Sequence, residues 1–302
     1  MRGEVSQPID QIEILSVGLL DRQRPTVLAL RRLARSLGLE FGWHYLLDLT
    51  WIISLLGPVK GRRILDAGAG TGVLQWYLAE QGAEVISVDR LSRARLPLRF
   101  RSRYNVRGLR AHDLLPASKL LRDSLTEKPR PPFKLKPQAR DLAGWADPHR
   151  AKGRVIIYNQ ELQNLCDLAD ASLDAVVAVS ALEHNPPGEL PVVAAELMRV
   201  LKPEGMLLAT LGAARDADWL HAPSQGWCYT EASLRHHFDL PAEAPSNYDR
   251  YDALFTALRD CTELRHGLAS FYYKSGENGM PWGRWDPQYQ TVGVCKVKRI
   301  LD

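Results

Sequence analysis

The sequence predicts an α/β fold, and residues 62–89 carry most of that prediction. One apolar run ends on Asp66, and a second apolar run ends on Asp89. Between the two runs lie three glycines at alternate positions, Gly68, Gly70 and Gly72. An amphipathic segment with helical spacing follows them. The order strand, glycine turn, helix, strand is that of the first half of a nucleotide-binding α/β unit.

The glycines have a physical reason to be there. A sharp turn from a strand into a helix needs residues that tolerate positive φ, and a ligand approaches the backbone closely only where there is no Cβ. Free N–H groups at the start of the helix favour an anionic ligand group. Asp89, at the end of the next strand, can accept both hydroxyls of a ribose. The spacing is not that of a dinucleotide fingerprint, because Val73 stands where that fingerprint has its third glycine.

Three stretches in order resemble the class I S-adenosylmethionine-dependent methyltransferases. Residues 66–72, DAGAGTG, look like the first motif of that family. Residues 173–185, LDAVVAVSALEHN, are similar to its strand and loop with the pattern FD-x-V…LEH. Residues 196–210, ELMRVLKPEGMLLAT, resemble its E-x-x-R-V-L-K-P-G-G helix, turn and fifth strand, with Glu204 in place of the first glycine. We therefore identify the chain as a member of this family.

The resemblance implies both a fold and a cofactor. The fold is a three-layer α/β/α Rossmann-like sandwich with a seven-stranded, mostly parallel sheet whose last strand is antiparallel. The cofactor is S-adenosyl-L-methionine. The resemblance assigns the methionyl end of the cofactor to the glycine turn, with Asp66, Gly68, Gly70 and Gly72. It assigns the ribose to Asp89 and the adenine to Glu161 and Leu162, in the loop after the third predicted strand, with Asp167 as the alternative there. Ser180, in the loop after the fourth predicted strand, is one further expected cofactor contact.

Residues 1–58 are predicted to form an N-terminal helical cover on a methyltransferase domain of residues 59–302. In the family, helices before the first motif often cover the cofactor and help to shape the acceptor pocket. The segment 41–45 is therefore a candidate for ligand contact, with Tyr45 as a candidate substrate-binding residue. The alternative is that the aromatic residues of this segment pack and that His44 is an ordinary surface histidine.

Residues 90–154 form a basic block with 18 Lys and Arg against 5 Asp and Glu. Within it, a proline-rich insertion at about 110–153 is predicted to be irregular, because such sequence builds a core poorly. Arginine-rich sequence suits phosphate, so the block could bind RNA or a small anionic substrate. It could equally be a solvated positive face or a lid, and aromatic interleaving typical of single-stranded nucleic-acid binding is sparse.

The loop after the fourth predicted strand is expected at the carboxyl edge of the sheet, where open α/β folds bind ligands. His184 is the candidate general base, because histidine titrates near neutrality, and Glu183 is a second candidate catalytic residue. The alternative is that the LEH triplet orders the loop.

The closing part of the chain is predicted to supply two strands, at 268–273 and 291–297. Their connection is long and aromatic, and it offers three candidate substrate-binding residues, Trp282, Arg284 and Trp285. Asp286 and Tyr289 lie beside them in the sequence and could line the same pocket. The alternatives are a packed hairpin loop and a dimer contact.

Composition limits the remaining functions. The four cysteines form no C-x-x-C pair, so neither a zinc site nor a disulfide framework is expected. The longest apolar stretch, 46–56, contains Asp48 and is too short to span a membrane, and no signal peptide is recognised, so we expect a cytoplasmic protein without a membrane partner. The expected activity is methyl transfer to a small polar acceptor, the hydroxyl or amine of a sugar-like or secondary metabolite. An RNA methyltransferase and a non-catalytic cofactor-binding module are the alternatives.

Overall fold

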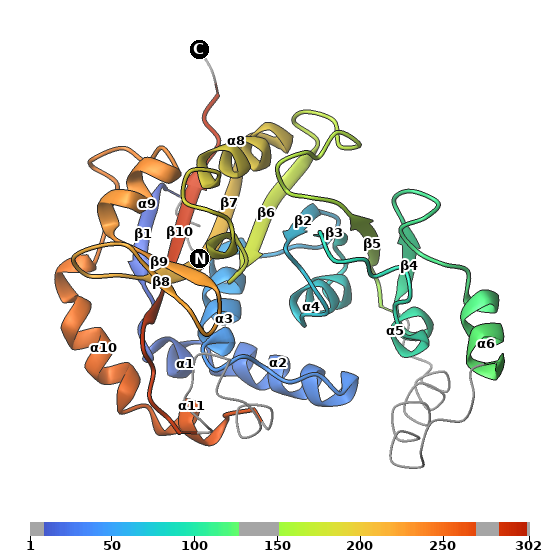
Figure 1. The fold of residues 1–302 in the computed structure, drawn as a ribbon, viewed down its shortest axis with the longest axis horizontal. Coiled ribbons are helices and arrows are strands. Elements are labelled where there is room, and N and C mark those ends of the chain that lie inside the picture. The colour runs from blue at the N-terminus through green and yellow to red at the C-terminus, as the bar shows by residue number, and fades with distance from the viewer. Residues whose placement is uncertain (1–8, 127–150, 270–283, 301–302) are drawn as a thin grey trace, which may run out of the picture. The chain divides into compact units, whose positions relative to one another are not determined.

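The computed structural model describes residues 9–126, 151–269 and 284–300 (Figure 1). The chain divides into two compact units, one within residues 58–165 and the other within 1–57 and 166–302. Each unit is described by itself below. The predicted boundary at residue 58 between a helical cover and a methyltransferase domain stays a prediction.

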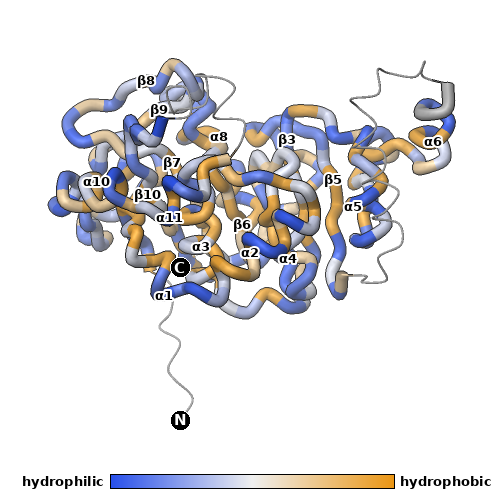
Figure 2. The backbone as a smooth tube through the Cα atoms, turned by 90° about the horizontal axis from the view of Figure 1, so that it is seen from below, coloured by the Kyte–Doolittle hydropathy of each residue, from blue (hydrophilic) through white to orange (hydrophobic). Residues whose placement is uncertain are grey.

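The unit of residues 58–165 is built on a parallel sheet. Its strands lie in the order β2 (Arg63–Ala67), β3 (Glu84–Asp89), β5 (Arg154–Asn159) and β4 (Asn105–Gly108). Helix α4 (Leu74–Glu80) connects β2 to β3, as the sequence predicts. The inner residues of β2, β3 and β5 are continuously buried, which is expected of parallel strands covered on both faces. Figure 2 shows the apolar character of β5.

Strand β4 was not predicted. The sequence analysis placed no strand between Asp89 and residue 154, whereas the structure has α5 (Leu98–Arg103), β4 and α6 (Ala117–Thr126) there. The strand escapes sequence analysis because it is four residues long and Val106 is its one apolar side chain. Residues 127–150, which include most of the predicted insertion, lie outside the described residues.

The other unit contains a mixed sheet. Its strands lie in the order β1 (Gln11–Ile14), β10 (Gln290–Val297), β7 (Leu201–Ala213) and β6 (Leu173–Val179). Strand β10 runs antiparallel to both neighbours, and β6 runs parallel to β7. Two short strands, β9 (Gly226–Tyr229) and β8 (Trp219–His221), extend the sheet from the end of β7. The predicted antiparallel last strand is confirmed.

The predicted count of seven strands is too low, since the described residues hold ten. The N-terminal segment supplies β1, whose alternating burial fits an edge strand paired to β10. The predicted strand at 268–273 is wrong at its start, because Leu268 and Ala269 lie outside any strand, directly after a helix. Its remaining residues lie outside the described ones. The Rossmann-like α/β fold with mainly parallel pairing is confirmed.

The unit of the mixed sheet also contains helices. They are α1 (Leu19–Arg22), α2 (Arg24–Leu37), α3 (Tyr45–Leu56), α8 (Leu190–Val200), α9 (Glu231–His237), α10 (Tyr251–Arg259) and α11 (Thr262–His266), with short 3₁₀ turns η3 (Leu182–His184) and η4 (Tyr248–Arg250). Among the described residues, no helix combines the length and the apolar character that crossing a bilayer would need.

Helix α3 is apolar on almost every face, as expected of a buried helix, and it packs against β6, β7 and β10. Its Trp51 lies flat against Gly293 of β10, where an added Cβ would stand 2.5 Å from the ring. The indole N–H of Trp51 also donates to Glu13 of β1 over 2.8 Å. These contacts fix the helix on the sheet, and so they fix the position of the residues at its N-terminus.

Candidate functional site

The glycine turn after β2 is joined to the end of β3 by one carboxylate. Gly68 and Gly70 have φ of 69° and 48°, in the left-handed region that glycine tolerates. The N–H of Gly70 donates to Oδ2 of Asp89 over 2.8 Å, and the N–H of Leu91 donates to Oδ1 over 2.8 Å. An ionised carboxylate has about four acceptor positions, so each oxygen keeps capacity for a ligand hydroxyl.

Asp66 is a buried acid beside this turn. Its side chain accepts from the backbone N–H of Gln75, and the residue is 2% exposed. Burial raises the pKa of Asp66, the guanidinium of Arg93 lowers it and the charge of Asp89 raises it, and the net result is a pKa of about 7. A carboxyl in this state gains most from a neighbouring cation, because a cation stabilises its ionised form.

Arg93 lies buried beneath the turn rather than on a basic surface. Its Nη1 donates to the carbonyl of Gly70 over 3.3 Å, and its Nη2 donates to the carbonyls of Ser87 and Tyr158 over 2.6 and 3.2 Å. Burial lowers the pKa of Arg93, and the charges of nearby aspartates oppose that effect. Sequence analysis counted this arginine with the basic block.

The residues of the turn fit the adenosyl group that the resemblance implies. Gly70 has no side chain, and an added Cβ would stand 3.8 Å from Oδ2 of Asp89, the carboxylate that the resemblance assigns to the ribose. Spare acceptor positions and a buried acid lie beside it. Glu161 is exposed and Leu162 is half-buried in the loop after β5, while Asp167 is exposed. Their adenine role stays a prediction, as does the cofactor contact of Ser180.

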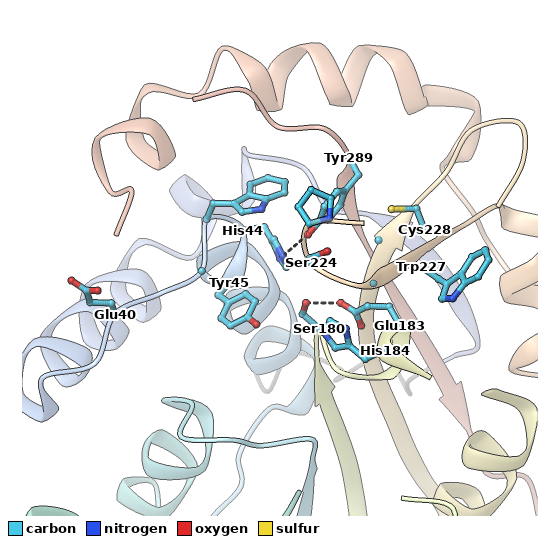
Figure 3. Close-up of a pocket in the computed structure, with 15 residues that line it drawn as sticks. Glu40, His44, Tyr45, Ser180, Glu183, His184, Ser224, Trp227, Cys228 and Tyr289 are labelled. Atoms are coloured by element: carbon cyan, nitrogen blue, oxygen red, sulfur yellow. Dashed lines mark hydrogen bonds between the residues drawn. The ribbon is translucent and has the colours of Figure 1, made fainter. Parts of the chain in front are cut away.

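A cavity of about 340 Å³ lies in the unit of residues 1–57 and 166–302 (Figure 3). Its walls come from residues 40–45 at the start of α3, from the loop and 3₁₀ turn after β6, from Gly212 of β7, from residues 223–228 and from Tyr289. The chain therefore brings segments from both ends of the sequence to one hollow. Its aromatic lining is Trp43, Tyr45, Trp227 and Tyr289.

His44 and Asp48 form a buried pair at this cavity. Nδ1 of His44 lies 2.6 Å from Oδ2 of Asp48, and the hydroxyl of Thr291 donates to Oδ1 of Asp48 over 2.7 Å. On the other side of the ring, Nε2 lies 3.4 Å from the hydroxyl of Tyr289 (Figure 3). The interpretation of His44 as a surface histidine is wrong, since the residue is 5% exposed. Packing of Trp43 is confirmed by its 3% exposure.

Glu183 faces the same cavity with one oxygen unused. Ser180, held at φ 46°, donates its hydroxyl to Oε1 of Glu183. Oε2 is buried and has no hydrogen-bond partner among the described residues. Burial raises the pKa of Glu183, and the neighbouring His184, Ser180 and His44 oppose that rise. His184 is itself exposed, and its Nδ1 lies 3.1 Å from the carbonyl of Gln225. The catalytic roles predicted for Glu183 and His184 stay predictions.

The aromatic connection contributes to the site mainly through Tyr289. Trp282 lies outside the described residues. Arg284 is exposed, and Trp285 donates its indole N–H to the carbonyl of Arg259 over 2.7 Å. Trp285 also meets the edge of Trp43 at 6.1 Å between ring centroids, so it lies behind the cavity wall. The substrate roles predicted for these residues and for Tyr45 stay predictions.

Sequence analysis missed Asp48 and Trp227. It used Asp48 as a break in an apolar stretch, although a single acid in an apolar helix, four residues after a histidine, is the spacing of an intrahelical pair. Trp227 gave no such signal. Among residues 9–126, 151–269 and 284–300, no group of three His, Cys, Asp or Glu side chains is placed to hold a metal ion.

Comparison with known proteins gives the family. A family model described as a methyltransferase domain matches residues 43–255. A ubiquinone biosynthesis O-methyltransferase of Bordetella avium is 46% identical over 43 residues, which is 14% of this chain and 18% of that protein. The chain thus matches under a fifth of the length of this curated relative.

Two solved structures of low identity show the extent of the likeness. A SAM-dependent methyltransferase of Methanosarcina mazei is 14% identical, covers 80% of this chain and 94% of its own, and has a TM-score of 0.40. The 1,6-didemethyltoxoflavin-N1-methyltransferase of Burkholderia thailandensis is 15% identical, covers 93% and 81%, and has a TM-score of 0.37. With 43–255 matched by the family model, the chain belongs to the methyltransferase-domain family, the class I methyltransferases whose cofactor is S-adenosyl-L-methionine.

Proposed function

We propose that this protein transfers the methyl group of S-adenosylmethionine to a hydroxyl or amine of a small polar acceptor. The observation that carries the proposal is the joining of the bare turn at Gly70 to Asp89, which leaves acceptor positions for a ribose. Bound S-adenosylmethionine supplies a methyl group on a sulfonium, a good leaving group. The protein's task is then alignment, with a base needed where the acceptor must lose a proton.

The cavity supports a small acceptor. Its volume of about 340 Å³ falls in the range of small-molecule sites, and its aromatic walls are interrupted by a few polar groups. Such a lining excludes water and orients a flat or compact molecule by contact and hydrogen bonding. The acceptor would be held by residues 40–45, the turn after β6 and Tyr289.

The arginines between residues 90 and 110 favour this proposal over RNA methylation. Six of the eight make contacts inside their own unit, with carboxylates, backbone carbonyls or aromatic rings: Arg93, Arg95, Arg99, Arg101, Arg103 and Arg110. A guanidinium already bonded within the fold must give up those contacts before it binds a phosphate. These six arginines are therefore used for folding, and RNA remains the alternative substrate.

Cofactor binding is tested by calorimetric titration with S-adenosylhomocysteine. We expect saturable binding that weakens by about tenfold or more, ~1.4 kcal/mol, in Asp89→Ala. Asp249→Ala, at an exposed acid in η4, is the matched control and should bind normally. Absence of binding by the native protein, or equal binding by Asp89→Ala of native circular dichroism, would contradict the assignment.

The acceptor class is tested with methyl-labelled cofactor and a cell extract. Label in a small molecule supports the proposal. Label in nuclease-sensitive material supports the RNA alternative. Intact binding of S-adenosylhomocysteine without any labelled product supports the non-catalytic module.

A further inference from the structure

The ring of His44 is fixed in one orientation at the cavity wall. Trp43, Tyr45 and Tyr289 meet it edge-on, at 4.7, 5.0 and 5.8 Å between ring centroids. Asp48, fully buried, stands 2.6 Å from Nδ1 and receives its other hydrogen bond from Thr291. A carboxylate accepts at Nδ1, so Nδ1 carries the ring proton and Nε2 is the acceptor.

Nε2 is the side of the ring that remains available for a ligand. The hydroxyl of Tyr289 lies 3.4 Å away, beyond the usual hydrogen-bond range, so this contact holds Nε2 weakly. His44 is also one of the residues that line the cavity. A hydroxyl that enters the cavity can therefore displace the tyrosine contact and donate to Nε2.

We propose that the cavity takes a phenolic acceptor, and that His44, oriented by Asp48, removes the proton of its hydroxyl during methyl transfer. This inference rests on the proposed methyltransferase function. The phenol oxygen forms a bond to the methyl carbon, and the carbon–sulfur bond of the sulfonium breaks with its electrons on sulfur. The hydroxyl proton moves to Nε2, and the resulting imidazolium is stabilised by Asp48 until the proton leaves to solvent.

The chemistry of the base selects the class of hydroxyl. Histidine side chains titrate near about 6.5 and phenols near about 10, whereas water, and hydroxyls as weakly acidic as water, lie near about 15.7. Proton transfer to a histidine is therefore far less uphill from a phenol. A neutral amine needs no base before it attacks. The four aromatic rings of the lining offer flat apolar surface to a phenol ring.

The other titratable groups that face His44 are worse bases. Burial raises the pKa of Glu183, so a larger share of this acid is protonated and unable to accept a proton, and the hydroxyl of Ser180 already donates to its Oε1. Tyr45 and Tyr289 carry hydroxyls of the same phenolic kind as the proposed acceptor, so they offer no stronger base. Asp48 has both oxygens engaged. His184, on the turn after β6, is exposed, and its Nδ1 faces the carbonyl of Gln225 rather than a carboxylate.

Binding of para-nitrophenol tests the acceptor class directly, because its absorbance separates phenol from phenolate. Titrated with the native protein plus S-adenosylhomocysteine, the probe should bind saturably and show a phenolate-to-phenol ratio raised about tenfold over buffer at the same pH. His44→Gln should lose that rise, and His266→Gln, at an exposed histidine of α11, should keep it. No saturable binding, or the full rise in His44→Gln, overturns the inference.

The role of Asp48 as a positioning residue is tested by Asp48→Asn. An asparagine amide can donate to Nδ1 and so favour the tautomer with the proton on Nε2; the analogous exchange in the serine-protease triad lowers kcat by about 10⁴-fold. Imidazole nitrogen NMR, which needs no substrate, should show Nδ1–H in the native protein and Nε2–H in Asp48→Asn. An unchanged tautomer overturns the inference. Should Asp48→Asn not fold, Thr291→Val keeps the carboxylate and must keep the Nδ1–H tautomer.

Turnover separates this inference from the proposed function. With methyl-labelled cofactor and para-nitrophenol, we expect Asp48→Asn to lower kcat by about 100-fold or more while KM changes by less than about threefold. A parallel fall in kcat and rise in KM would indicate a merely structural role. Methylation of an amine or a sugar but not of the phenol would overturn the inference and leave the proposed function intact. Failure to bind S-adenosylhomocysteine would overturn both.

Discussion

Replacing Asp66 by asparagine should stabilise the protein at neutral and alkaline pH. The native acid is 2% exposed, and burial raises its pKa from 3.8 to about 7 because the ionised form is deprived of water. A rise of this size corresponds to about 4 kcal/mol of free energy spent on holding the charge in the folded protein. Asparagine carries no charge and can still accept from the backbone N–H of Gln75.

The sign follows from proton linkage. Between the unfolded pKa of 3.8 and the folded pKa of about 7, the folded protein binds one more proton than the unfolded chain. The contribution of Asp66 to the free energy of unfolding therefore falls as the pH rises through this window and is constant above it. The advantage of Asp66→Asn should be close to zero near about pH 4 and reach about 4 kcal/mol near about pH 8.

Urea unfolding, followed by circular dichroism at about pH 5, 6, 7 and 8, measures the difference between the two proteins. Asp249→Asn, at an exposed acid, is the control and should give a flat difference. A difference for Asp66→Asn that is flat, or that shrinks as pH rises, would refute the reasoning. The stabilised variant should bind S-adenosylhomocysteine more weakly, because it lacks the carboxylate that we expect to meet the methionyl end of the ligand.

Three further outcomes follow from the packing and charges. Gly293→Ala should lower the free energy of unfolding by about 1–3 kcal/mol, because its Cβ would stand 2.5 Å from the ring of Trp51, whereas Gly188→Ala, with open space around it, should change little in the same urea titration. Arg93→Met should cost about 3 kcal/mol or more, since it removes a buried cation from among carboxylates, and a near-neutral result in urea unfolding would show that the buried arginine is not needed. Glu183→Gln should raise the free energy of unfolding above neutral pH, because the raised pKa of this buried acid shows that its charge is costly to bury. The same variant should turn over labelled cofactor more slowly, because Oε2 of Glu183 is buried at the cavity without a partner among the described residues. Undiminished turnover would exclude this acid from the acceptor site.

The glycine turn could be predicted because its signals are local. Positive φ at Gly68 and Gly70 follows from residue type, and acids at strand ends are visible once the apolar runs are seen. Apolar runs of this kind predict buried parallel strands, and β2, β3 and β5 confirm them. The short strands were missed, because four residues such as Asn105–Gly108 acquire strand geometry from a neighbour rather than from their own pattern.

The acceptor side could not be predicted in the same way. His44 and Asp48 are four residues apart, but their burial depends on Thr291 and Tyr289, more than 240 positions later. Arg93 was one basic residue among many until its partners on β3 and β5 were placed around it.

The sequence by itself determined the family, the alternation of strands and helices, and the glycine turn after Asp66, since these depend on residue type and spacing within a few turns of chain. Tertiary structure alone decided which polar side chains are buried, paired and aimed at a cavity. The physical reason is that desolvation and hydrogen-bond geometry act between residues that are neighbours in space, and for His44 those neighbours come from the opposite end of the chain.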